Sequence, residues 1–354
     1  MKREYFIGLD AHGSFCELAV TTAKGKVVGR VRCQTAIASL RPLIEKVPAP
    51  RHLVFEEGPL ANWLYRNLKE CVTSLTVAEP RRNRLICCEG DKDDPVDAEN
   101  LAQLLRGGYI KPVHQTETLA ETVFKQLVAQ YHRRVRRRVV AGQQLSALLK
   151  QHGVMARARH FTKTEDRAGL LKQLPADRLL LEMVTTSWTE YDALRTCEDT
   201  WRQRLVKWAK QDETVVRFVE LPGVSWIRAS TLRVYLDTPW RFRSKKALWK
   251  YLGIGLDRRT SGDGPEMLSV PKRTHRLLKS TILGAAMSAI AQGDNPFADQ
   301  HRRWLDHGLS PKMAKRNVAR SLSATLWGMW KSDTVYHPEW VGGNGAATSG
   351  IELS

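Results

Sequence analysis

The first 112 residues consist of short apolar runs separated by turn residues. Runs rich in β-branched and aromatic side chains predict strands at residues 4–10, 15–22, 26–33, 51–57 and 74–79. Segments with helical spacing and helix-start or helix-stop residues predict helices at residues 35–47, 59–70, 81–88 and 95–106. Three strands followed by alternating helices and strands indicate an α/β domain with a mixed sheet.

Residues 113–212 show instead the spacing of long amphipathic helices. Thr118 and Glu121 form the pattern of a capping box at the start of the first helix. Apolar residues then recur at Leu119, Val123, Leu127 and Tyr131, and later in a near-heptad series at Val184, Trp188, Tyr191, Leu194, Trp201, Leu205 and Trp208. The pattern predicts a helical spacer, either an antiparallel pair or an intermolecular coiled coil, with a loop at residues 153–176.

Residues 213–335 predict a third, mainly helical part, with helices at residues 276–290 and near 312–331. The tail, residues 336–354, ends in a stretch rich in glycine, serine and alanine, which predicts disorder. The chain thus divides into four expected segments: residues 1–112, 113–212, 213–335 and 336–354.

The net charge is +19, with 56 basic and 37 acidic residues, which points to a polyanionic partner. Nucleic acid is the first candidate and an anionic membrane surface is the alternative. Residues 1–112 contain 17 basic and 14 acidic residues, whereas the rest of the chain contains 39 and 23. This asymmetry favours a catalytic module at the front and a polyanion-binding module behind it.

No apolar run reaches the roughly 20 residues that a membrane-spanning helix needs. Asp10 interrupts the apolar N-terminal stretch, so we expect no signal peptide and a cytoplasmic protein. The six cysteines show no metal-binding spacing, which predicts buried free thiols.

Six carboxylates lie between Glu89 and Glu99 in this basic chain. Because Pro95 suits the first position of a helix, Asp94 is expected at the N-cap and Asp97 in the first turn, where helix N–H groups stabilise acids. Capping does not explain the acids upstream, whose mutual repulsion a bound divalent cation would offset.

Two further acidic positions follow apolar strands. Asp10 ends the strand at residues 4–10, and the pair Glu56 and Glu57 ends the strand at residues 51–57. Singly, each is typical of a solvated loop or a cap. Ligand sites of α/β sheets lie just beyond such strand ends, so together with the later helix start they predict a Mg²⁺ site for phosphodiester chemistry.

These motifs resemble the DEDD transposases of bacterial insertion sequences, relatives of the Piv-type DNA invertases that include recombinases guided by a bridge RNA. The family has an Asp after one apolar strand, a Glu after another, and Lys-Thr-Asp-x-x-Asp-Ala. Here these read GLDAH (Asp10), FEEG (Glu56, with Glu57 as the alternative) and KDDPVDA (Asp94 and Asp97). The resemblance implies a ribonuclease-H-like, RuvC-type fold for residues 1–112, with these four acids as Mg²⁺ ligands. Asp93 departs from the family's Thr.

The resemblance continues in FVELPGVSWIRASTL and WRFRSKKALWKYLGIGLDRRTSGDG, which look like the family's C-terminal transposase domain. It implies that Ser261, in Ser-Gly, is the nucleophile, and it allows a composite site formed by different protomers of a homo-oligomer, a dimer or a tetramer. By itself, a Ser-Gly pair is more often only a turn. The family's Lys-x-Gly reads Lys272-Arg273-Thr274 here, so that turn differs.

Several positive or turn-forming positions are candidate nucleic-acid contacts. The densest group, within HRRVRRRVV, predicts contact with phosphates or with unpaired RNA bases. Pro222-Gly223-Val224 resembles a helix-hairpin-helix turn, with a plain loop as the alternative. The eleven tryptophans predict core or dimer packing. The predicted contacts are Arg133, Arg134, Arg136, Arg137, Arg138, Gly223, Arg258, Arg259, Lys272 and Arg273.

Three functions follow from these features. The first is a DNA transposase or site-specific recombinase that uses Mg²⁺ and Ser261, associates with the bacterial nucleoid and is guided by a structured non-coding RNA. The RNA is implied by the resemblance alone. The second is a metal-dependent, structure-specific nuclease, such as a junction resolvase, that uses water. The third is a non-enzymatic packaging protein, which would not need the clustered acids.

Overall fold

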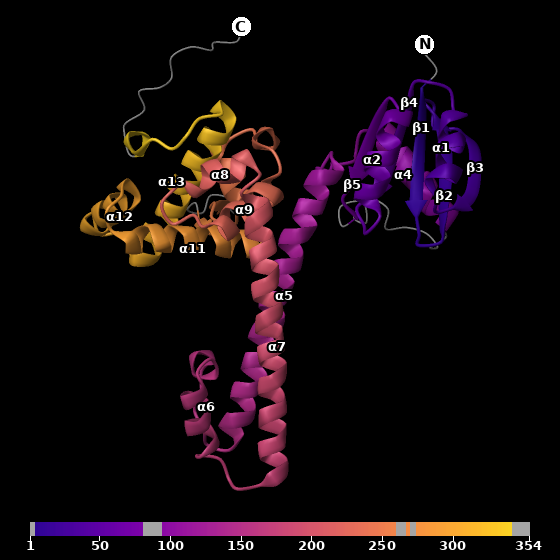
Figure 1. Ribbon diagram of the computed structural model, residues 1–354. Helices are drawn as coiled ribbons and strands as arrows, with labels where there is room; N and C mark the ends of the chain where they lie inside the picture. Colours follow the sequence, from indigo (N-terminus) through magenta and orange to yellow (C-terminus); the bar gives the residue numbers. More distant parts are fainter. Residues whose placement is uncertain (1–3, 81–93, 260–266, 270–273, 342–354) are drawn as a thin grey trace. The chain divides into compact units, whose positions relative to one another are not determined.

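The computed structural model describes residues 4–80, 94–259, 267–269 and 274–341, and the chain forms two compact units, residues 1–122 and 123–354 (Figure 1). Each unit has hydrophobic clusters of its own. The finer division predicted from the sequence stays a prediction. Within the described ranges, no helix combines the length and the apolar character that a bilayer-spanning segment requires.

The first unit is built on a five-stranded mixed sheet with the order β3-β2-β1-β4-β5 (Figure 1). β1 pairs antiparallel with β2 and parallel with β4, and β4 continues parallel to β5. The five predicted strands are confirmed as β1 (Tyr5–Ala11), β2 (Phe15–Thr22), β3 (Val27–Gln34), β4 (Arg51–Glu56) and β5 (Ser74–Ala78). This topology is compatible with the expected ribonuclease-H-like domain.

Side chains alternate between the two faces of this sheet. One face buries Ile7, Leu9, Leu53 and Phe55 against α1 (Ile37–Glu45) and α2 (Ala61–Leu68). The short 3₁₀ helix η1 (Lys69–Cys71) follows α2. Burial of each such side chain contributes roughly 2 kcal/mol. The other face packs against α4 (Asp94–Arg106), which confirms the helix predicted at 95–106. The predicted helix at 81–88 lies outside the described residues.

Gly8 is the point of closest approach between β1 and α4. A Cβ atom at Gly8 would lie 1.9 Å from Ala98 O and 2.8 Å from Ala102 N. Both are backbone atoms and cannot move without the helix. The glycine within the strand is therefore what lets α4 lie directly on the sheet.

The prediction of buried free thiols is confirmed for two cysteines of the first unit, whereas Cys33 is only half-buried and Cys87 and Cys88 lie outside the described residues. Cys16 and Cys71 are buried and form no disulfide. Burial raises the pKa of both thiols, which keeps them protonated and unreactive.

Two long helices, α5 (Leu119–Gln151) and α7 (Arg178–Ala209), run antiparallel and pack along their lengths. Arg138 Nε donates to Glu198 Oε2 over 2.5 Å, and the guanidinium of Arg134 stacks 4.3 Å above the ring of Trp201. The expected cap is present, since Glu121 N donates to Thr118 Oγ1 over 3.2 Å. Of the two arrangements predicted for the spacer, the structure contains the antiparallel pair within one chain.

The loop predicted at residues 153–176 is wrong in part, because η2 (Ala158–Phe161) and α6 (Thr164–Leu171) form there. Phe161 packs against Trp188, and Arg167 forms a bidentate ion pair with Asp192 of α7, at 2.6 and 2.7 Å. That ion pair also lowers the pKa of Asp192. A partner distant in the sequence stabilises α6, so local spacing gave no sign of it.

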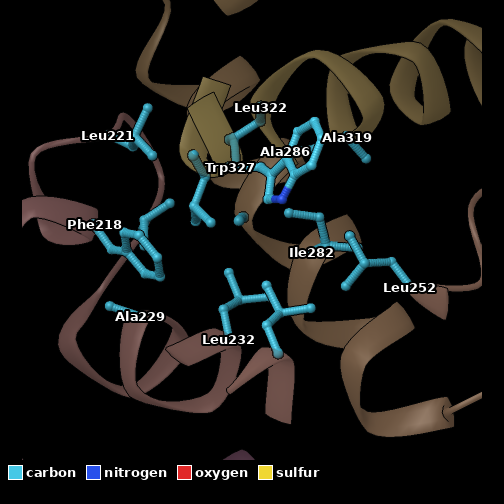
Figure 2. Packing of buried hydrophobic residues seen from close by; sticks show 14 of the residues in the cluster. Phe218, Leu221, Ala229, Leu232, Leu252, Ile282, Ala286, Ala319, Leu322 and Trp327 are labelled. Carbon is cyan, nitrogen blue, oxygen red and sulfur yellow. The ribbon is translucent and has the colours of Figure 1, made fainter. Parts of the chain in front are cut away.

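The rest of the second unit is mainly helical, as predicted. Figure 2 shows its core, in which Phe218, Leu232, Ile282, Leu322 and Trp327 meet. The predicted helix at 276–290 is α11 and the last predicted helix is α13. The elements are α8 (Glu213–Val219), α9 (Trp226–Leu236), η3 (Pro239–Arg241), α10 (Lys245–Tyr251), β6 (Asp257–Arg259), β7 (Met267–Ser269), α11 (Arg276–Gln292), α12 (Pro296–Asp306), α13 (Pro311–Ser332) and η4 (Pro338–Trp340).

Candidate active site

Asp10 and Glu56 lie at the carboxyl ends of two adjacent parallel strands. Leu9 of β1 is paired with Phe55 of β4, so Asp10 and Glu56 occupy the next positions along the two strands. Leu9 and Phe55 point into the core beneath α1 and α2, and their successors therefore point to the opposite face. The two acids share the face that α4 covers.

The direction of α4 brings its first residues to the same end of the sheet. Ala98 lies over Gly8, and further along the helix Gln103 Nε2 donates to Gly25 O over 2.8 Å. Gly25 belongs to the turn after β2, where Ala23 N donates to Glu4 O, just before β1 begins. The helix therefore runs antiparallel to β1, and Asp94 starts it at the end where Asp10 lies. Asp97 is exposed in the first turn.

An imidazole orients the Asp10 carboxylate. His12 Nε2 donates to Asp10 Oδ2 over 2.9 Å, and the ring of His12 stacks on Phe15 with 4.6 Å between centroids. The guanidinium of Arg32 in turn lies 4.3 Å from the Phe15 centroid, and Arg32 pairs with Glu17. This stack fixes the imidazole, and through it one oxygen of Asp10, in a defined direction.

The donor set suits a hard divalent cation, because carboxylate oxygens at a helix start and two strand ends are the ligands that Mg²⁺ prefers. Among the side chains that the structure describes, no three of His, Cys, Asp and Glu gather closely enough to hold a metal ion. The side chain of Asp94 lies outside that set, as do the upstream acids Glu89, Asp91 and Asp93. Asp10 and Glu56 lie at neighbouring strand ends on the face that α4 covers, and their predicted role as metal ligands stays a prediction.

Several predicted site residues fall outside the described positions. Ser261, Lys272 and Arg273 are among them, and of Arg258 and Arg259 the structure gives only the backbone, in β6. Their predicted roles stay predictions.

The five arginines of α5 divide into two groups. Arg134 and Arg138 are engaged in the packing against α7, with Trp201 and Glu198 respectively. Arg133, Arg136 and Arg137 are exposed. The surface open to a nucleic acid is therefore smaller than the sequence indicates.

His132, beside these arginines, adds no charge to them at neutral pH. Its Nε2 donates to Thr231 Oγ1 over 2.8 Å, because the Thr231 hydroxyl itself donates to Ile227 O. Burial, and secondarily the charge of Arg136, lowers the pKa of His132 to about 4. The ring serves the packing of α5 against α9 as a neutral hydrogen-bond donor.

Gly223 lies in a tight turn between α8 and α9. Its φ is +78°, and a Cβ there would lie 2.2 Å from Ala285 O of α11. Gly223 O accepts a hydrogen bond from Arg228 Nη1 over 2.7 Å, and Ser225 caps α9. These contacts give Gly223 a packing role, and its predicted contact with phosphate stays a prediction.

Core packing is confirmed for most of the tryptophans whose side chains the structure describes, whereas two are exposed in the single chain, where dimer packing stays a prediction. Trp188 and Trp327 are buried, whereas Trp208 is 58% and Trp240 71% exposed. Trp208 lies in the last turn of α7 and continues its apolar rhythm, but the neighbouring Ala209 is buried instead. Trp240 lies in PWRFRSKK, and that mixture of aromatic and basic residues is the signal by which the sequence could have identified it.

Two family models match the chain. Residues 7–154 match the IS110 DEDD model, which is described as a transposase, and residues 216–302 match the model described as Transposase IS116/IS110/IS902 family. The first match contains Asp10, Glu56, Asp94 and Asp97, and the second contains Ser261.

Two curated relatives come from Sinorhizobium fredii (strain NBRC 101917 / NGR234). One, named "Putative transposase y4pF/y4sB", is 23% identical over 252 residues, which are 69% of this chain and 64% of the relative. The other, named "Putative transposase y4qE", is 26% identical over 305 residues, or 80% of this chain and 71% of the relative. The chain thus spans less than two-thirds of the first relative's length.

The front sheet domain with its acids, the helical second unit and the two matches together define a transposase-type protein of the DEDD class. The chain belongs to the IS110 family of DEDD transposases.

Proposed function

We propose that the chain is the DNA transposase of an insertion sequence, a site-specific recombinase that cleaves and exchanges DNA strands. The observation that carries this proposal is the placement of Asp10 and Glu56 at neighbouring strand ends on the face covered by α4, whose first residue is Asp94. The family matches support the same activity. The sheet topology supports a ribonuclease-H-like fold for this domain.

The proposed cofactor is Mg²⁺, held by Asp10, Glu56, Asp94 and Asp97. The alternation of β4 favours Glu56 over Glu57, because Glu56 follows Val54 on the α4 face of the sheet. Mg²⁺ supplies charge stabilisation at phosphate oxygens and lowers the pKa of an attacking group. His12 holds Asp10 in a fixed direction, as ligands of a metal require.

Ser261 is the proposed nucleophile, because it occupies the family's Ser-Gly position. Its hydroxyl attacks the scissile phosphorus, the bond to the leaving 3′ or 5′ oxygen breaks, and the proton passes to a base. The product is a phosphodiester between the protein and one DNA end, and attack by a free DNA hydroxyl reverses the step on a new partner.

A second candidate is a nuclease of the junction-resolvase type, favoured by the fact that all four acids belong to the first unit. Acids and metal alone suffice to activate water. Under this alternative the second unit only binds DNA, and no protein–DNA bond forms.

Substitution of Ser261 distinguishes the two. In the presence of Mg²⁺, the wild-type protein is expected to form a covalent adduct with labelled DNA of the insertion-sequence ends, seen as a shifted band on a denaturing gel. S261A is expected to form no such adduct. Ser269→Ala, in the same segment, is the matched control and should keep it. Cleavage by S261A at the wild-type rate, without any adduct from the wild type, would establish the nuclease instead.

A structured guide RNA is the proposed partner, since the resemblance implies one and the exposed Arg133, Arg136 and Arg137 offer cationic contacts. Sequencing of the nucleic acid that co-purifies with the protein is expected to yield one discrete RNA species encoded beside its gene. A random mixture of cellular RNA would contradict the guided mechanism. A homo-oligomer is proposed on the resemblance alone, and mass photometry of the same sample measures its size.

A further inference from the structure

Trp240 is the most exposed tryptophan for which the structure describes the side chain, with 71% of its surface open to solvent. It lies in η3, between α9 and α10 of the second unit. An exposed indole of this size is unfavourable in water unless a partner covers it, because it leaves a large apolar area hydrated. The other tryptophans of this region, Trp249 and Trp327, instead direct their N–H groups to backbone carbonyls within the fold.

The turn that carries Trp240 is held on both sides. On one side, Trp327 Nε1 donates to Pro239 O over 2.8 Å, which ties the turn to α13. On the other, Arg241 Nη1 donates to Tyr235 O over 3.1 Å, and its guanidinium stacks 4.5 Å from the Tyr251 centroid. The indole is therefore presented on a fixed support, so binding through it costs little conformational entropy.

One cation lies over the indole, and three more, all exposed, follow it closely in the chain. Lys331 Nζ of α13 lies 5.1 Å from the Trp240 centroid and 4.0 Å from the centroid of Trp327, so this cation covers part of the indole and leaves the rest of the ring open. Arg243, Lys245 and Lys246 follow in the chain and are exposed, and residues 238–251 contain no acidic residue. A flat apolar ring in a basic, acid-free segment matches one chemical partner well, a nucleobase whose neighbouring phosphates contact the lysines and arginines.

A double helix does not offer such a base, because its bases are stacked and paired. A bare aromatic ring gains stacking energy only from a base that has left the helix or was never paired. Strand cleavage and exchange create unpaired bases in the DNA, next to the sites of cleavage.

We propose that Trp240 is a stacking platform for an unpaired DNA base, with Lys331, Arg243, Lys245 and Lys246 contacting the adjacent phosphates. This inference rests on the proposed function, in which the chain handles opened DNA. It assigns a binding role to a segment that lies before the proposed nucleophile in the chain and outside the acidic site.

Fluorescence anisotropy with labelled oligonucleotides tests the platform without any need for catalysis. The probes are a 20-nucleotide oligo(dT), a 20-nucleotide oligo(rU) and a 20-base-pair DNA duplex, at one fixed salt concentration, because phosphate contacts depend on salt. Trp240→Ala is expected to weaken oligo(dT) binding by about 10-fold, which corresponds to ~1.4 kcal/mol. Trp240→Phe, which keeps a ring, should stay within about threefold of the wild type, and duplex binding should change by less than about twofold.

Trp208→Ala is the matched control, since Trp208 is the other tryptophan that is exposed among the described side chains, and it lies on α7. It should leave oligo(dT) binding within about twofold of the wild type. The platform would be overturned by an equal loss of oligo(dT) affinity in both alanine variants. It would also be overturned by an equal loss of affinity for duplex and single strand, or by a Phe variant that binds as weakly as the Ala variant. A Trp240 effect confined to oligo(rU) would overturn DNA as the occupant. Absence of any DNA binding by the wild-type protein would instead contradict the proposed function.

Discussion

Replacement of Asp10 by asparagine is expected to reduce Mg²⁺-dependent DNA cleavage by about 10³-fold, equivalent to about 4 kcal/mol of transition-state stabilisation. Asparagine keeps the shape of the side chain and an acceptor for the His12 hydrogen bond, but it removes the negative charge. Since Asp10 and Glu56 share one end of the sheet, loss of one charge weakens the hold on the cation that both are proposed to bind. Cleavage of DNA carrying the insertion-sequence ends measures the effect.

The matched control is Glu57→Gln, which removes the same charge from the position after Glu56. Glu57 N donates to Ala78 O beyond the end of β4, and the side chain does not continue the Val54–Glu56 face. Its activity should stay within about threefold of the wild type. A thermal unfolding curve unchanged in D10N excludes misfolding. Full activity in D10N, or a loss in E57Q as large as in D10N, would contradict the assigned ligands.

Replacement of Gly8 by alanine is expected to destabilise the first unit by about 3 kcal/mol. The added methyl group would meet Ala98 O at 1.9 Å and Ala102 N at 2.8 Å, so α4 must move away from the sheet. Hydrogen exchange of the amides in α4, measured by mass spectrometry, should rise more than that of α1 and α2 on the opposite face. Cleavage should fall as well, because Asp94 and Asp97 move with the helix.

Gly29→Ala is the control for Gly8. Gly29 also lies within a strand, β3, but a Cβ at Gly29 meets no atom within 4 Å. The substitution should be neutral, or stabilising by less than about 1 kcal/mol, because alanine restricts the unfolded chain. If the amides of α4 exchanged no faster in G8A than in G29A, the close contact between Gly8 and α4 would not exist in solution.

The strands and the helices on the sheet could be predicted because their signals are local. The alternation that marks Leu9 and Phe55 as buried also fixes Asp10 and Glu56 on the other face. The helix α6 could not be predicted, since Trp188 and Asp192, which contact its Arg167, come more than twenty residues later. Tertiary partners of this kind leave no trace in the spacing of a segment.

For the site, the sequence indicates which residue types matter but not what their side chains contact. Arg134 and Arg138 look the same as Arg133 in the sequence, yet their partners Trp201 and Glu198 lie sixty or more residues away. His12 was not identified from the sequence, although it follows Asp10 by two positions. Its role in orienting Asp10 depends on the turn between β1 and β2, which stacks the His12 ring on Phe15.

Whether Asp10, Glu56 and the first turn of α4 bind one cation is tested most directly by a crystal structure of the protein soaked in Mn²⁺, read by anomalous scattering. We expect a peak within about 2.5 Å of an oxygen of Asp10 and an oxygen of Glu56, completed by Asp94 or Asp97. Side chains of Asp10 and Glu56 too far apart to share an ion, or the absence of any peak at this end of the sheet, would contradict the account.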